Sequence, residues 1–488
     1  MTKEPLFLSK QWHLEELNAK YAWNKKITGK NVTVCVVDNG VYYNPDLEIE
    51  ETKENPITKD LNVILRDEAY LHGTSVAGII GAKGNKYVLG IAYECTMTAY
   101  DLWYSGGGNF NLFIKFLKKN KYKIDIYNNS WGPEISDNPN DFDKPKLFRA
   151  IEKCSKKGRN GKGNIFVFSS GNENLEGGLA SYVSTINNRF TIGVGAMNSD
   201  LDMSTYSNYG LNVLCIAPAG YDKSELDSRV NTNIIAFSDQ LGITTIQPSN
   251  KYLSKKGFIP YTHNFNGTSA ACPMVSGSIA LLLSYRPDLT WRDVKELISL
   301  SSLQDYYINN TVPNTDFILN GRKQIVSQRT GYGLINIKNL IKNAKNWRLL
   351  PREKNIVKKR QYDILLNNNN TEFITTLDID KKISIETVQI YLTVNSNPPL
   401  LDELIFNTKI TLISPQGTRL PLINILFLEQ ESIVFKNQYY DNEPLLCELL
   451  RGENSNGMWT IQFNFIPVES LPNAKFNLKR IKLDIYGH

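Results

Sequence analysis

The sequence predicts an α/β unit built on a parallel sheet with helices on both faces, followed by an antiparallel β-sandwich or barrel. A chain of 488 residues is too long for one ordinary hydrophobic core, which favours two units. Up to Trp347, apolar runs rich in β-branched residues alternate with helical patterns; after it, polar and apolar residues alternate and Asn, Pro and Gly are frequent. The boundary is therefore predicted near residue 348, between units 1–347 and 348–488.

The strands of the first unit are short, continuous apolar runs, which are typical of strands buried on both faces. The first of them, residues 32–37, ends in the turn sequence Asp38-Asn39-Gly40. Helical patterns at 112–119 and 146–156 fall between later runs, so parallel strands joined by crossover helices are expected. The further strands are predicted at 97–102, 124–129, 164–169, 190–195 and 212–216.

Ligand sites of such sheets lie beyond the carboxyl ends of the strands. Both Asp38 and Asn129-Ser130 follow predicted strand ends. Farther along, the apolar run 273–283 predicts a helix with Pro273 in its opening turn, which places Ser269 at a helix N-terminus where negative charge is favoured. Another helix is predicted at 290–300, with Thr290 as its N-cap.

The second unit follows a basic, proline-containing stretch at 348–360, which we interpret as a solvated linker, the alternative being a processing site or a site for an anionic partner. Within the first unit, residues 219–264 form a long connection with only short strand-like pieces such as 242–246. A connection of this length is usually functional or poorly ordered. Antiparallel strands of the second unit are predicted at 387–394, 409–414, 459–465 and 479–486.

The composition bears on partners and location. A net charge of +6 with scattered basic residues argues against a nucleic-acid partner, and no apolar run is long enough to span a bilayer. The first seven residues have neither a basic nor an apolar segment, so no secretory signal is visible. The six cysteines are spaced singly, which indicates neither a zinc site nor a disulfide framework, and Cys35 and Cys215 are expected to be buried.

Three separated segments supply an acid, a base and a nucleophile in that order: Asp38, His72 and Ser269. A serine hydroxyl that attacks a carbonyl needs an imidazole to accept its proton, and the imidazole needs a carboxylate to fix its tautomer. The alternatives are a structural turn acid for Asp38 and, as the base, His263, which we interpret as a loop histidine. The order acid, base, serine is that of subtilisin and differs from the trypsin-like and α/β-hydrolase orders.

These segments resemble the subtilases, and further segments resemble their kexin/furin-like branch. The resemblance covers almost the whole chain, and the segments occur in the expected order. They are 9–14, 126–133, 289–294, 331–336 and 344–347 in the catalytic unit, and 413–420, 456–460 and 483–487 in the C-terminal β-sandwich called the P domain.

The resemblance implies a subtilisin-like parallel sheet, a P domain and a serine endopeptidase that works through an acyl-enzyme. Asn172, in the segment Ser169-Ser170-Gly171-Asn172, would donate to the oxyanion beside the backbone N–H of Ser269. An extended polypeptide substrate would pair with two edge segments by β-augmentation. The implied substrate-binding residues are Gly106, Gly107, Gly108, Ser130, Trp131, Gly132 and Ser170.

The resemblance also implies a Ca²⁺ ion held by Asp46 and Asn85 with carbonyl groups from residues 83–88, the alternative being plain surface polar residues. Subtilases of this branch usually fold with a pro-region, and none precedes residues 9–12. Either the chain begins at a mature terminus or a separate prodomain, inhibitor or chaperone is a partner. The implied location is the secretory pathway, the periplasm or the exterior, with the cytoplasm left open because no signal is visible.

Kexin and furin cut after paired basic residues with the help of clustered carboxylates, and most of these acids are absent here. Asn39 follows Asp38, Ala69 precedes His72, Phe113 occupies a helix position that is usually acidic, and 181–188 carries no acid. The acids that could compensate are Glu134, Asp137, Asp143 and Glu173. We therefore predict weakened or absent dibasic preference; the alternatives are a true dibasic-specific convertase and a catalytically silent binding protein.

Overall fold

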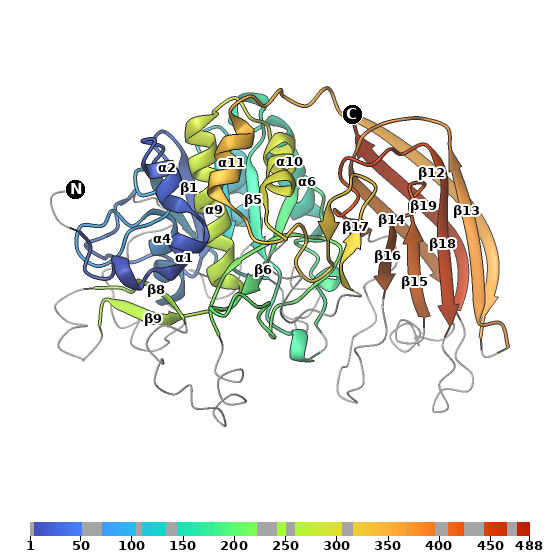
Figure 1. Ribbon diagram of the computed structural model, residues 1–488, viewed down its shortest axis with the longest axis horizontal. Coiled ribbons are helices and arrows are strands. Elements are labelled where there is room, and N and C mark those ends of the chain that lie inside the picture. Colours follow the sequence, from blue (N-terminus) through green and yellow to red (C-terminus); the bar gives the residue numbers. More distant parts are fainter. Residues whose placement is uncertain are drawn as a thin grey trace.

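The computed structural model describes residues 4–50, 71–103, 110–132, 144–176, 178–221, 242–249, 259–304, 316–367, 369–395, 408–423, 444–465 and 476–488. Two units lie side by side (Figure 1): an α/β unit that contains the N-terminus and an all-β unit that contains the C-terminus. The last helix of the first unit ends at Ala344 and the first strand of the second begins at Lys354, so the predicted boundary near 348 falls between them.

The first unit is built on a seven-stranded sheet in the order β2-β3-β1-β4-β5-β6-β7, and every adjacent pair is parallel. Successive side chains point to opposite faces: Ile126 and Val167 enter one core cluster, whereas Tyr127 and Phe166 enter the other. This is why the strands read as continuous apolar runs. The strands are β1 (Thr33–Asp38), β2 (Ile49–Glu50), β3 (Thr96–Asp101), β4 (Ile126–Asn129), β5 (Ile165–Ser169), β6 (Thr191–Met197) and β7 (Val213–Pro218).

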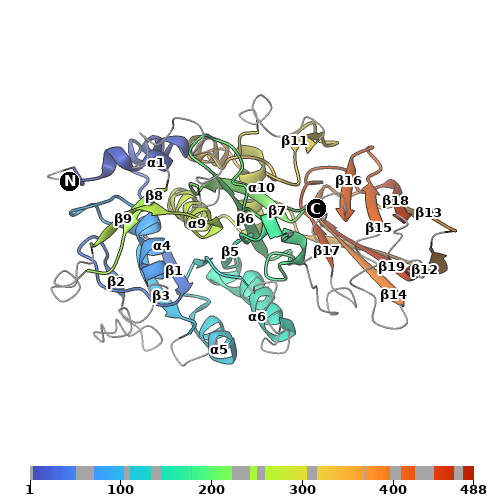
Figure 2. The same cartoon turned by 90° about the horizontal axis from the view of Figure 1, so that it is seen from below.

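Helices cover both faces of this sheet, as predicted (Figure 2). One face carries α4 (His72–Gly81), α9 (Thr268–Tyr285), α10 (Trp291–Ser301) and α11 (Ile337–Ala344), and the other carries α5 (Phe110–Asn120) and α6 (Lys144–Lys157). Shorter helices are α1 (Trp12–Glu16), α2 (Ala19–Trp23), η1 (Leu8–Lys10), η3 (Arg159–Gly161), η4 (Asn174–Glu176) and η5 (Ala180–Tyr182). Thr290 caps α10 in a reciprocal capping box with Asp293, as expected.

The long helix α9 runs through the core of the first unit. Among the described residues it is the one helix long and apolar enough to cross a membrane, but 83% of its apolar window is buried inside the protein. It begins at Thr268, five residues before the position we predicted, so Pro273 is its sixth residue rather than part of its first turn. Cys35 and Cys215 are fully buried in the core, as expected.

Part of the long connection at 219–264 folds into a hairpin of β8 (Ile243–Ile246) and β9 (Tyr261–Phe265). Hydrogen bonds of 3.0 Å from Ser75 Oγ to the Ile246 carbonyl and 2.7 Å from Thr245 Oγ1 to the Ser75 carbonyl attach this hairpin to α4. The predicted strand piece at 242–246 is thus confirmed, while 222–241 and 250–258 lie outside the described residues.

The second unit is a sandwich of two four-stranded antiparallel sheets, in the orders β12-β19-β14-β17 and β13-β18-β15-β16. Trp459 is fully buried in its core. The strands are β12 (Lys354–Leu366), β13 (Glu372–Ile379), β14 (Ile385–Asn395), β15 (Thr408–Ile413), β16 (Arg419–Ile423), β17 (Leu445–Cys447), β18 (Gly457–Phe465) and β19 (Phe476–Gly487); the short pair β10 (Ile318–Leu319) and β11 (Ile325–Val326) belongs to the first unit.

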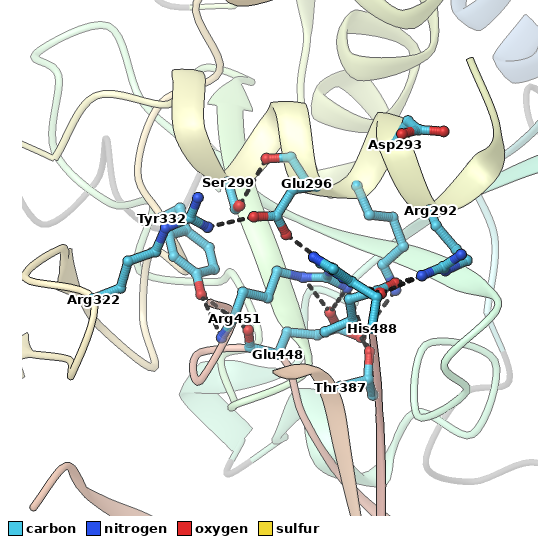
Figure 3. Close-up of polar contacts among 12 residues, drawn as sticks. Arg292, Asp293, Glu296, Ser299, Arg322, Tyr332, Thr387, Glu448, Arg451 and His488 are labelled. Atoms are coloured by element: carbon cyan, nitrogen blue, oxygen red, sulfur yellow. Dashed lines mark hydrogen bonds and ion pairs between the residues drawn. The ribbon is translucent and has the colours of Figure 1, made fainter. Parts of the chain in front are cut away.

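Buried charges join the two units (Figure 3). The carboxylate of Glu448 accepts a hydrogen bond of 2.9 Å from Lys295 Nζ on α10, and Glu386 on β14 accepts one of 2.8 Å from Arg292 Nε. Burial alone would raise the pKa of Glu386, but hydrogen bonds from His488 and Arg292 lower it to about 2. The face that α10 turns to the second unit is therefore ionic, and its charges are compensated.

Candidate active site

Asp38 and His72 form a direct pair at the carboxyl edge of the sheet. Asp38 ends β1 and is 2% exposed, and His72 begins α4; His72 Nδ1 lies 2.9 and 3.1 Å from the two carboxylate oxygens. Burial lowers the pKa of His72, but the charge of Asp38 and its hydrogen bond raise it, and the net shift is upward. Because Nδ1 faces the carboxylate, Nε2 is the ring atom left to accept a proton.

Asn39 and Gly73 hold this pair in place. Asn39 N donates to Asp38 Oδ1 at 2.9 Å, and Asn39 Oδ1 accepts the Gly73 N–H at 3.1 Å at the start of α4. A side chain at Gly73 would collide with the carbonyl oxygen of Gly40, so the close approach of helix to turn requires glycine there. In the sequence, Asn39 was notable only because it stands where the kexin branch carries an acid. The structure shows that it links the Asp38 carboxylate to α4, the helix that carries His72.

Ser269 is placed by a reciprocal pair of hydrogen bonds with Ser130. Ser269 Oγ donates to the Ser130 carbonyl at 3.1 Å, and Ser130 Oγ donates to the Ser269 carbonyl at 3.0 Å. The Ser269 carbonyl is available because its helical partner would be Pro273, which has no N–H. Among the described residues Ser269 and His72 share no hydrogen bond; such contacts are often long before substrate binds.

Asn128 fixes the end of β4 against α9. Its Nδ2 donates to Ser130 Oγ at 3.1 Å, and its Oδ1 accepts hydrogen bonds from Ser276 Oγ at 2.8 Å and Cys272 Sγ at 3.3 Å. All of these polar groups are buried and satisfied by one another. The strand and the helix that carry the two serines are thereby locked together.

Asn172 lies beside the start of α9, as its predicted role requires. Its Oδ1 accepts hydrogen bonds from Thr268 N at 2.8 Å and Thr268 Oγ1 at 2.9 Å, which fixes the orientation of the amide. No described residue accepts a hydrogen bond from Asn172 Nδ2, so this donor remains available. Gly267, with φ of +82°, has no side chain to crowd that nitrogen.

Asn208 and Glu173 form a clamp that sequence reasoning missed. Asn208 Oδ1 accepts the Glu173 N–H at 2.9 Å, Asn208 Nδ2 donates to Glu173 Oε2 at 2.6 Å, and the same oxygen accepts the Asn172 N–H at 3.0 Å. The clamp shapes the loop that presents the Asn172 amide. The one signal in the sequence is the position of Glu173 directly after Asn172, and nothing marks Asn208, which is 35 residues away.

The predicted substrate-binding residues lie at the same edge where the structure describes them. Trp131 and Gly132 follow Ser130, and Ser170 is buried directly after β5. The Trp131 ring lies 5.5 Å from the Phe168 ring and 6.5 Å from the Phe113 ring. Gly106, Gly107 and Gly108 lie outside the described residues, as do Ala69, Glu134, Asp137 and Asp143.

The predicted calcium ligands do not fit a calcium site. Both oxygens of the buried Asp46 carboxylate accept backbone hydrogen bonds, from Lys86 N and Tyr87 N at 2.6 Å and from Val88 N at 3.0 Å. The exposed Asn85 uses its amide nitrogen to donate to the Pro45 carbonyl at 3.1 Å. Calcium needs six to eight oxygen ligands, whereas this loop surrounds the carboxylate with N–H groups that take the place of a cation.

The competing histidine, His263, lies on β9 rather than in a loop. Its Nδ1 is 3.1 Å from Thr244 Oγ1, and its ring packs 4.9 Å from that of Phe7. These contacts tie it to the hairpin and the N-terminal segment, so the structure pairs His72, and not His263, with the carboxylate.

Comparisons with known proteins agree with this geometry. The subtilase family profile matches residues 29–333. Proprotein convertase subtilisin/kexin type 6 of Rattus norvegicus is 28% identical over 97% of this chain and 48% of its own length, and furin-like protease 2 of Drosophila melanogaster is 28% identical over 94% and 27%. The chain thus spans half or less of the length of these relatives. The crystal structure of the serine protease of Aeromonas sobria superposes with a TM-score of 0.78 at 20% identity, covering 99% of this chain and 96% of that one.

Proposed function

The chain belongs to the subtilase family and is related to furin- and kexin-type proprotein convertases, and from this premise we propose that it hydrolyses peptide bonds as a serine endopeptidase. The observation that carries the proposal is the Asp38–His72 pair at the same sheet edge as Ser269 and Asn172. The proposed catalytic unit is 1–347, and the proposed P domain is 348–488.

In the proposed reaction, Ser269 Oγ attacks the scissile carbonyl carbon while His72 Nε2 accepts the hydroxyl proton. The carboxylate of Asp38 stabilises the imidazolium that forms. The tetrahedral oxyanion accepts hydrogen bonds from Asn172 Nδ2 and the Ser269 backbone N–H. Collapse of this intermediate passes the proton from His72 to the leaving amine and leaves an acyl-enzyme, which water then hydrolyses by the same steps.

The proposed specificity is weakened or absent preference for paired basic residues. Phe113, at a position where kexins usually carry an acid, is 1% exposed and its ring centre lies 6.5 Å from that of Trp131, so a buried aromatic ring stands where those proteases carry a carboxylate. The carboxylate of Glu173 is already engaged by Asn172 and Asn208. Asp101, at the end of β3 near Gly40, accepts the Trp103 N–H at 3.0 Å. Cleavage of a peptide library tests this; a strict requirement for Arg or Lys before the cut would contradict it.

The proposed partners are polypeptide substrates and a folding helper. A structural neighbour, the Aeromonas sobria serine protease, was solved in complex with a chaperone, with a TM-score of 0.78 to this chain. This supports a separate chaperone, prodomain or inhibitor for the present chain, with secretion as the proposed location. Calcium at Asp46 and Asn85 is not part of the proposal, because the loop geometry does not fit it.

Labelling with a fluorophosphonate probe tests the proposed chemistry and separates it from a catalytically silent binding protein. The wild-type chain is expected to be labelled, and Ser269→Ala to be unlabelled. Ser284→Ala is the matched control, because Ser284 lies at the other end of α9 and donates only to the Leu281 carbonyl. A folded wild-type chain that neither labels nor cleaves any peptide would sink the proposal.

A further inference from the structure

The charge of this chain is unevenly distributed. Residues 110–164 contain thirteen basic and six acidic residues, a net charge of +7. The whole chain carries +6, so the rest of it carries −1. Thirteen of the 55 basic residues, which we expected to be scattered, therefore lie in this one stretch, which contains the helices α5 and α6 and the turns that follow them.

The fold brings these residues to one surface, which we call the lysine patch. The C-terminal ends of α5 and α6 meet: Arg159 N and Asn164 Nδ2 donate to the Lys121 carbonyl at 3.0 and 2.9 Å. Burial raises the pKa of Cys154, between the helices, to about 11, and the nearby charges of Lys121, Lys153 and Lys118 oppose that rise. The lysine patch consists of Lys118, Lys121, Lys123, Lys153, Lys156 and Lys157, five of them exposed and Lys121 half-buried.

The two acids that the structure describes in this stretch pair with only one lysine of the patch. Asp125 is engaged by the buried Arg159, with Arg159 Nε at 3.0 Å, and by Thr33 N at 2.9 Å. Glu152 pairs with Lys156 at 2.7 Å. Helix C-termini favour lysine through the helix dipole, but that effect accounts for a cation or two per helix and not for the six lysines of the patch.

The patch lies at the opposite edge of the sheet from the active site. The end of α5 leads into the start of β4, and the end of α6 leads into the start of β5. Ser130 follows the other end of β4. An anionic partner bound at the patch therefore leaves the catalytic edge open, so the patch serves attachment rather than substrate recognition.

The residue types indicate which anionic partner fits. Eleven of the thirteen basic residues are lysines, and Arg159 is buried on Asp125. Lysine is a point charge on a flexible stem, whereas planar arginine is the residue that reads bases and binds phosphates bidentately. Tyr122, between Lys121 and Lys123, is 58% exposed, and Lys121 Nζ lies 4.2 Å from its ring centre. An exposed amphipathic ring among lysines is typical of proteins that attach to lipid headgroups.

We propose that the lysine patch attaches this protein to the surface of an anionic lipid bilayer, with Tyr122 at the headgroup level and the active site facing away. Attachment rests on charge, so it requires anionic lipid and weakens with salt. It does not depend on the proposed protease activity and is measured separately from it.

Co-sedimentation of the full chain with vesicles tests this proposal. Binding is expected to vesicles that contain phosphatidylglycerol, not to vesicles of phosphatidylcholine alone, and is expected to vanish near roughly 1 M salt, where the screening length is about 3 Å. Each lysine contributes about fivefold, so removal of four is expected to weaken binding at least roughly 100-fold. The test variant replaces Lys118, Lys123, Lys153 and Lys157 by Ser.

The matched control replaces four exposed lysines of the second unit by Ser: Lys354, Lys358, Lys359 and Lys381. It has the same net charge as the test variant and is expected to bind as the wild type does. Equal loss in both variants, or binding to neutral vesicles, overturns the proposal. Retention on heparin or double-stranded DNA without vesicle binding also overturns it, in favour of another polyanion. Even if a variant fails to fold, the salt dependence of vesicle binding by the wild type tests the proposal.

Discussion

Replacing Glu448 by Gln should destabilise the protein strongly while changing its shape very little. The carboxylate is fully buried between the two units, where it accepts hydrogen bonds of 2.9 Å from both Lys295 Nζ and Arg451 Nε, and a further one from the Arg451 guanidinium (Figure 3). The amide of Gln is nearly isosteric, so the substitution removes one negative charge and turns one acceptor into a donor facing two cations.

The expected loss follows from the charges that remain. Lys295 and Arg451 both pair with Glu448, and Glu296, which also pairs with Arg322, has its Oε2 3.6 Å from Arg451. Removing Glu448 leaves a surplus positive charge in a buried site, and breaking such a pair costs about 3 to 5 kcal/mol. The charged form of Lys295 is already disfavoured, because burial lowers its pKa to about 8 even with the attraction of Glu448.

The acidity of Glu448 gives a second test of the same reasoning. Burial alone would raise its pKa, but Arg451 and Lys295 lower it overall. A lowered carboxyl pKa contributes stability that is present above the unfolded pKa of about 4.5 and is lost as pH falls through the folded value. The difference between wild type and Glu448→Gln should therefore be full at pH 7 and shrink below about pH 4.5.

Urea unfolding at pH 7 measures the effect, with Asp363→Asn as the control. That substitution makes the same chemical change at the exposed pair of Asp363 with Lys479, where the carboxyl side chain is 80% exposed, and should stay within about 0.5 kcal/mol of wild type. A free energy of unfolding for Glu448→Gln within about 1 kcal/mol of wild type, or equal to that of the control, would refute the argument.

Four further outcomes are expected. The acid limb of kcat/KM should lie above pH 6.5, because His72 must be neutral to accept a proton and its pKa is raised; a limb below 6.5 contradicts the pairing with Asp38. Asn172→Ala should lower kcat about 100- to 1000-fold with KM little changed, and an unchanged kcat excludes its oxyanion role. Burial lowers the pKa of His13 to about 3, so below pH 6.5 the unfolded chain binds a proton that the folded chain does not. The free energy of unfolding should therefore fall by about 1.4 kcal/mol per pH unit. His13→Leu should reduce this dependence in urea unfolding from pH 7 to 5. Finally, Asp46→Asn should lower the free energy of unfolding by about 3 kcal/mol because three N–H groups lose a charged acceptor, and any change of Tm with EDTA or Ca²⁺ should be the same in this variant as in the wild type; a rise in Tm with Ca²⁺ that Asp46→Asn abolishes contradicts the amide-filled loop.

The fold was predictable where the chain carries a periodic signal. Strands β1, β5 and β7 are continuous apolar runs because both faces of the sheet are covered, and strands such as β13 and β18 of the second unit alternate because one of their faces is exposed to solvent. The start of α9 was misplaced because Pro273 suggests a first turn. Its missing N–H is tolerated deeper in the helix, since Ser130 Oγ satisfies the Ser269 carbonyl instead.

The site was predictable only in its reacting groups. Asp38 and His72, 34 residues apart, were paired from the chemistry that a serine nucleophile needs. Asn208 and Thr268 could not be found that way, because each acts through hydrogen bonds from a loop or helix end and leaves no pattern in the sequence. The lysine patch escaped for a related reason: its members are spread over forty positions and become neighbours only when two helix ends meet.

The hydrogen bonds between Ser269 and Ser130 bear on how the Ser269 hydroxyl would become a nucleophile. In the free site the nucleophile donates its proton to the Ser130 carbonyl and therefore holds it away from His72. A substrate strand that pairs with the segment Ser130–Gly132 brings its own N–H groups to that edge, where they compete for the same carbonyl. Loss of this acceptor leaves His72 Nε2 as the remaining base for the Ser269 hydroxyl. Substrate pairing and activation of the nucleophile would then be one event, and the reciprocal serine contact would keep the hydroxyl unreactive until a polypeptide is in place.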